Sequence, residues 1–76
     1  MKVEWEESDI KTGRRYGKPL TSERWVIGFL AGSGNNARFV SISLSDGMVT
    51  KPSTLAGLAA TLNEGGYQPE ELLPKE

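Results

Sequence analysis

The sequence predicts an α+β fold, a small antiparallel β-meander of three to four strands with one C-terminal α-helix packed on one face. Three observations lead to this prediction: two runs rich in β-branched and aromatic residues, an Asp-Gly pair after the second run, and a later stretch with leucines at helical spacing. A chain of 76 residues forms one small domain, 1–76, whose hydrophobic core is marginal for its surface.

The first two predicted strands are residues 24–31 and 37–44, and the Gly-Ser-Gly-Asn-Asn stretch between them favours a turn. A register with Ile27 opposite Ile42 collects the strongly apolar residues of both strands on one face, which we expect to face the helix. The reverse face then holds a half-apolar patch of Val26, Leu30 and Phe39.

Asp46 and Gly47 predict a two-residue hairpin turn, after which residues 48–51 return as a further strand with Val49 opposite Leu44. Ser53 is the predicted N-cap of a helix of about three turns. Gly65 and Gly66 end it, because glycine readily adopts the left-handed conformation of a helix C-cap. The residues at helical spacing are Leu55, Leu58, Ala59 and Leu62.

The two ends of the chain give weaker signals. Residues 2–6 alternate polar and apolar side chains, so Val3 and Trp5 predict an additional strand at one edge of the sheet. Residues 7–23 leave two alternatives open, a short strand around 10–16 or a flexible basic arm. In the C-terminal tail, 67–76, a proline followed by two glutamates predicts one more helical turn.

Charge is distributed unevenly along the chain. The formal net charge is −1, but five of the nine lysines and arginines lie within residues 11–24, which hold a single glutamate. The segments before and after this basic stretch, 1–10 and 52–76, are acidic. Such a local concentration of charge influences a binding partner more than the net charge does.

The basic stretch is the candidate nucleic-acid site. Its cations can contact phosphates while its tyrosine stacks on a base, although the acids of residues 4–9 are equally placed to neutralise them. The residues of this site are Lys11, Arg14, Arg15, Tyr16 and Lys18.

The apolar patch of Val26, Leu30 and Phe39 is the candidate protein-binding site. Apolar side chains on the solvent side of a sheet often mark a contact with another protein or with a second copy of the chain. The alternative is that the N-terminal strand folds over the patch and buries it.

The sequence excludes several kinds of site. It contains no cysteine and no histidine, so we expect no thiol nucleophile, no disulfide and no zinc site. Glu4 and Glu6 form a candidate carboxylate pair for catalysis or metal binding, but alternating glutamates more often keep an edge strand soluble. The glycine-rich stretch at 32–36 is followed by a strand rather than a helix, so it predicts a hairpin turn rather than a phosphate loop.

These observations predict a non-enzymatic protein that needs no cofactor and no metal. We expect a small protein-interaction module or regulator that binds through the outer sheet face or through residues 11–24, and the alternative is a nucleic-acid-binding accessory protein. No apolar run is long enough to cross a bilayer and no signal peptide is apparent, so we expect a cytoplasmic protein. Such folds recur in small bacterial and phage domains of unrelated function, so the fold class itself does not indicate a function.

Overall fold

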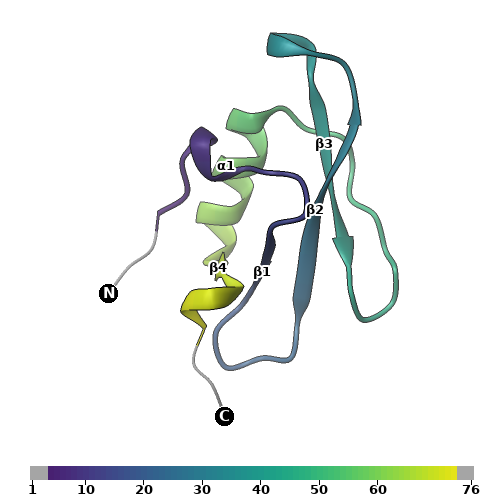
Figure 1. Ribbon diagram of the computed structural model, residues 1–76. Coiled ribbons are helices and arrows are strands. Elements are labelled where there is room, and N and C mark those ends of the chain that lie inside the picture. Colours follow the sequence, from purple (N-terminus) through teal and green to yellow (C-terminus); the bar gives the residue numbers. More distant parts are fainter. Residues whose placement is uncertain (1–3, 74–76) are drawn as a thin grey trace.

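The computed structural model describes residues 4–73 and confirms the α+β prediction. One antiparallel sheet has the strand order β3-β2-β1-β4, and a single α-helix lies beside it (Figure 1). The strands are β1 (Arg15–Gly17), β2 (Arg24–Ala31), β3 (Arg38–Ser43) and β4 (Gln68–Pro69), and the helix is α1 (Leu55–Gly65). Short 3-10 turns are η1 (Glu7–Asp9), η2 (Gly34–Asn36) and η3 (Glu70–Leu72).

The hairpin of β2 and β3 forms as predicted, but its register differs by one residue. Ile27 lies opposite Ser41 rather than Ile42, and Trp25 lies opposite Ser43. The register changes at a β-bulge between Phe29 and Ala31, because one extra residue there shifts every pair below it.

The shifted register exchanges the two faces of β3. Its serines face α1 and are almost completely buried, Ser41 at 1% and Ser43 at 7% exposure. These small side chains lie opposite large ones from β2, and the helix side of the neighbouring β1 holds the buried ring of Tyr16. The register therefore follows the volumes of neighbouring side chains. It does not gather the strongly apolar residues of both strands on one face, as the sequence predicted.

The predicted strand after the Asp-Gly pair is a looser segment alongside β3. Val49 lies opposite Ile42 rather than Leu44, and a second bridge joins Ser53 to Phe39. The turn is wider than the predicted two residues. The hydrogen bond that closes it runs from the backbone N–H of Ser43 to the carbonyl of Met48, over 2.8 Å.

The helix forms where it was predicted, with its cap one residue later. Thr54, not Ser53, is the N-cap, and its hydroxyl accepts a hydrogen bond from the backbone N–H of Gly57 over 3.1 Å. Gly66 ends the helix in the left-handed conformation with φ 73°, as expected. The chain then forms β4, a strand that the sequence did not predict, which pairs with β1.

The predicted N-terminal edge strand is wrong for residues 4–6, which form no strand. Val3, the other residue on which it rested, lies outside the described residues. Trp5 instead enters the core, at 3% exposure, and joins a cluster between the sheet and α1. That cluster consists of Trp5, Ile10, Tyr16, Ile27, Leu58, Ala59 and Leu62. We call the side of the sheet that bears Tyr16 and Ile27 the inner face, and the opposite side the outer face.

Candidate protein-binding surface

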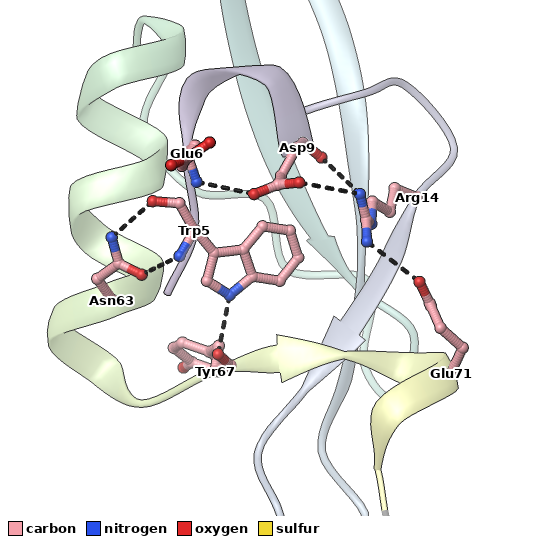
Figure 2. A network of polar contacts seen from close by, with 7 residues as sticks. All are labelled: Trp5, Glu6, Asp9, Arg14, Asn63, Tyr67 and Glu71. Carbon is pink, nitrogen blue, oxygen red and sulfur yellow. Dashed lines mark hydrogen bonds and ion pairs between the residues drawn. The ribbon is translucent and has the colours of Figure 1, made fainter. Parts of the chain in front are cut away.

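The basic stretch does not form one surface. Arg14 lies within a polar network beside the core, where it pairs with Asp9 at 3.7 Å and with Glu71 at 3.1 Å (Figure 2). Its guanidinium also lies 5.2 Å from the ring of Trp5, a distance that permits a cation–π contact. These contacts use much of the capacity of Arg14 to bind an external anion.

The other residues of the predicted nucleic-acid site are scattered. Tyr16 is buried at 3% exposure and donates its hydroxyl to Ser41, so its ring is not available for stacking on a base while the protein is folded. Lys18 lies 5.3 Å from the ring of Tyr67, and Lys11 is exposed ahead of β1. Only Arg15 lies on the outer face, where it is opposite Val26.

The predicted apolar patch is also divided between the two faces. Val26 remains on the outer face, and Leu30 is exposed at the bulge. Phe39 lies opposite Phe29 on the inner face, where the two rings meet edge to face at 5.5 Å. Phe39 also packs against the core, so it is not part of an outer patch.

The exchanged register places other apolar residues on the outer face than the sequence predicted. Val40 and Ile42 from β3 both lie over Gly28, where an added Cβ would be 3.5 Å from Val40 Cγ2 and 3.3 Å from Ile42 Cδ1. Leu44 continues the alternation of Ile42 and is 47% exposed. Val40 is itself buried, at 7% exposure, so the aliphatic surface open to a partner consists of Val26, Ile42 and Leu44, with Gly28 adding no height beside them.

Arginines surround this aliphatic surface. The outward positions of β1, β2 and β3 include three charged residues, Arg15, Arg24 and Arg38, and all three are cations. The guanidinium of Arg24 donates to the carbonyls of Thr21 and Glu23, and that of Arg38 donates to Asn35 and Ala37. Within residues 4–73 none of the three forms an ion pair with a carboxylate, so their positive charge is not neutralised.

The alternation of residues in both strands is consistent with this surface, but the predicted register assigned the residues of β3 to the opposite face. Residues 24, 26 and 28 alternate with residues that face the helix, and so do 38, 40 and 42. A bulge cannot be recognised from composition, and without it residues 40 and 42 were placed on the buried face.

The predicted carboxylate pair and the glycine-rich stretch are not part of this surface. Glu4 and Glu6 are exposed on a segment without regular structure. The Gly-Ser-Gly-Asn-Asn stretch is the hairpin connection that was predicted. Gly32 has φ 91°, and an added Cβ would collide with the Asn36 carbonyl oxygen, so this position requires glycine. In residues 4–73 no group of three or more carboxylates could hold a metal ion, and no helix there has the length and apolar character of a membrane span.

Two tyrosines on the inner side have altered acidity. Burial raises the pKa of Tyr16 to about 12, and the hydrogen bond to Ser41 only partly opposes this effect. Burial also raises the pKa of Tyr67, with a smaller contribution from the negative charge of Glu23. Both groups are neutral near pH 7, so neither is an activated base.

Comparisons with protein-family models, with curated proteins and with solved structures found no match to this chain.

Proposed function

We propose that this protein is a non-enzymatic interaction module whose outer face binds another protein, one that presents an apolar surface edged by carboxylates. The observation that supports the proposal best is the combination of an aliphatic area, Val26, Ile42 and Leu44, with three arginines around it that form no ion pair within residues 4–73. Apolar contact supplies most of the affinity of such a surface, and charge complementarity selects the partner.

Charge argues against a second copy of the chain as the occupant. Two outer faces stacked on each other would bring six arginines together, and the outward positions of β1, β2 and β3 offer no acid to neutralise them. Like charges at an interface cost free energy, whereas an acidic partner gains from the same arginines.

The nature of the aliphatic area argues against nucleic acid. Single-stranded nucleic acids bind to sheets through aromatic side chains on which the bases stack. The outward positions of β1, β2 and β3 hold aliphatic residues, glycines and arginines but no aromatic residue. A protein surface fits this chemistry better.

The test uses nuclear magnetic resonance titrations of the full isotope-labelled chain with two synthetic peptides, one alternating valine and glutamate and one alternating valine and lysine. We expect the glutamate peptide to shift the amide signals of Val26, Val40 and Ile42 in a saturable manner, and the lysine peptide to bind more weakly. Equal binding of both peptides, or shifts confined to the sheet edges at β4 and residues 48–53, would contradict the proposal.

Matched variants separate the outer face from the rest of the surface. Arg15→Met and Arg38→Met should each weaken binding of the glutamate peptide, and Lys11→Met should not, because Lys11 is exposed outside the strands. Ile42→Ser should weaken binding more than Leu20→Ser, since Leu20 is 94% exposed in the loop before β2.

Two further measurements test the other occupants directly. A dimer in sedimentation equilibrium that Ile42→Glu abolishes would identify a second copy as the occupant and overturn the proposal. Tighter binding of oligothymidine than of the glutamate peptide, with a steep loss as salt rises, would identify nucleic acid and overturn it as well.

A further inference from the structure

A cavity of about 240 Å³ lies between α1 and the inner face, on the opposite side of the sheet from the proposed protein-binding surface. Leu58 and Leu62 of α1 form part of its wall, together with the aromatic rings of Trp25 and Tyr67. Lys51 and Thr61 line it too, and both are exposed, so they mark the side that opens to solvent.

The size of the cavity suits a small organic molecule. An apolar cavity of about 150 Å³ in another protein holds benzene, so this cavity has room for one ring with a substituent. Its leucine and aromatic walls favour the flat, apolar body of such a ring.

The polar groups around the cavity favour an acceptor with negative charge. Among residues 4–73, Lys51 is the only charged side chain that lines it. The indole Nε1 of Trp25 is buried and has no hydrogen-bond partner within residues 4–73, which is a costly state for a donor. This atom is shielded from solvent although the side chain of Trp25 lines the cavity, so the indole must turn before a ligand there can accept its N–H.

We propose that this cavity is a binding site for a small aromatic carboxylate. The ring lies against Trp25, Leu58 and Leu62, and the carboxylate lies toward Lys51 and accepts the hydrogen bond that the indole of Trp25 now lacks. This site is independent of the outer face, because the sheet separates the two.

The test exploits the two tryptophans of the chain. The indole N–H of Trp5 donates to the carbonyl of Tyr67 over 2.8 Å and is already satisfied, whereas that of Trp25 is not. Titration of the full chain with benzoate should shift the indole N–H signal of Trp25 in a saturable manner, and the Trp5 signal should shift much less. Benzyl alcohol, which is similar in size but neutral, should bind about two- to fivefold more weakly, the range expected for one exposed ion pair.

Two variants at the site, with Lys11→Met as a control, separate binding in the cavity from non-specific binding. Lys51→Met should remove the preference for benzoate over benzyl alcohol, whereas Lys11→Met should retain it. Thr61→Phe should narrow the opening and weaken benzoate at least tenfold. Because Lys11, Lys51 and Thr61 are all exposed, the dispersed amide spectrum of the folded protein should persist in each variant.

Several results would overturn the proposal. The first is that benzoate does not shift the indole N–H signal of Trp25. The second is that benzylamine binds as tightly as benzoate. The third is that Lys51→Met binds benzoate with the same affinity as the unaltered chain.

Discussion

Asn63 in α1 holds the main chain of Trp5 with both ends of its side-chain amide. The amide oxygen accepts the backbone N–H of Trp5, and the amide nitrogen donates to the Trp5 carbonyl over 2.9 Å (Figure 2). This pair of bonds resembles one rung of a β-ladder, with a side chain in place of the second strand. It fixes the N-terminal segment to the helix, 58 residues later in the sequence.

Asn63→Ala should therefore destabilise the fold by about 1–3 kcal/mol, because two partly buried backbone groups lose their partners together. The measurement is urea unfolding followed by tryptophan fluorescence. Glu64→Ala, at the exposed neighbouring position, should change the free energy of unfolding by less than about 0.5 kcal/mol. A loss for Asn63→Ala as small as that of this control would show that the amide does not anchor Trp5.

The buried hydroxyl of Tyr16 should make stability fall at high pH. In the unfolded chain a tyrosine ionises near pH 10, whereas burial raises the pKa of Tyr16 in the folded protein to about 12. The folded state retains the proton that the unfolded state loses, so stability is complete below pH 10 and declines between pH 10 and 12. Two pKa units correspond to about 2–3 kcal/mol.

Urea unfolding at a series of pH values from 9 to 12 tests this expectation. Tyr16→Phe should flatten the decline above pH 10, and Tyr67→Phe should leave most of it, because Tyr67 is only partly buried. If the unaltered chain and Tyr16→Phe lose stability in parallel over this range, another group is responsible.

Arg14 and Arg15 are adjacent in sequence but should differ in their effects. Arg14→Met removes two ion pairs and a cation–π contact, all partly exposed, so we expect a loss of about 1 kcal/mol in the free energy of unfolding. Arg15→Met should change stability by less than about 0.5 kcal/mol, since its side chain is exposed. A double-mutant cycle of Arg14→Met with Glu71→Gln measures the pair directly, and a coupling energy of zero would contradict the contact.

Features that depend on residues nearby in the sequence were predicted correctly, and features that depend on contacts between distant segments were not. The helix and its glycine stop depend on nearby residues, and they were found within one residue. The hairpin of β2 and β3 was also found, but its register depends on a bulge at Leu30 and on side-chain volumes contributed by β1. Trp5 was assigned to a strand because residues 2–6 alternate polar and apolar side chains. That pattern is the same whether the backbone of Trp5 pairs with a strand or with the side chain of Asn63.

The candidate site shows the same limit. Val26 was placed on the outer face because alternation within β2 alone decides it. Phe39, Val40 and Ile42 were placed on the wrong faces, because their side depends on pairing across the hairpin. Arg15 was recognised only as part of a charged stretch, and its separation from Arg14 required the position of β1.

Leu20 has an unfavourable backbone conformation for its side chain. Its φ is 65°, in the left-handed region that costs an ordinary L-residue about 1–2 kcal/mol, and its side chain is 94% exposed. Leu20→Asn should raise the free energy of unfolding by about 0.5–1 kcal/mol, because asparagine tolerates this region and no buried contact is lost. Leu20→Val should lower it, since β-branching makes positive φ worse. Urea midpoints that rank these two variants in the opposite order would contradict the backbone assignment.

The register of β2 and β3 makes opposite demands on two adjacent residues of β3. Ser41 faces α1 at 1% exposure and accepts the hydroxyl of Tyr16, whereas Ile42 faces outward and is only partly buried. Ser41→Val should therefore cost about 2–4 kcal/mol, because it overfills the core and leaves the Tyr16 hydroxyl without its acceptor. Ile42→Ser should cost about 1 kcal/mol, since it removes apolar area from a surface that is already open to water. In the register that collects apolar residues under the helix, the two costs would be reversed. Urea unfolding of both variants decides between the registers, and a larger loss for Ile42→Ser would return Ile42 to the core and remove the aliphatic part of the proposed protein-binding surface.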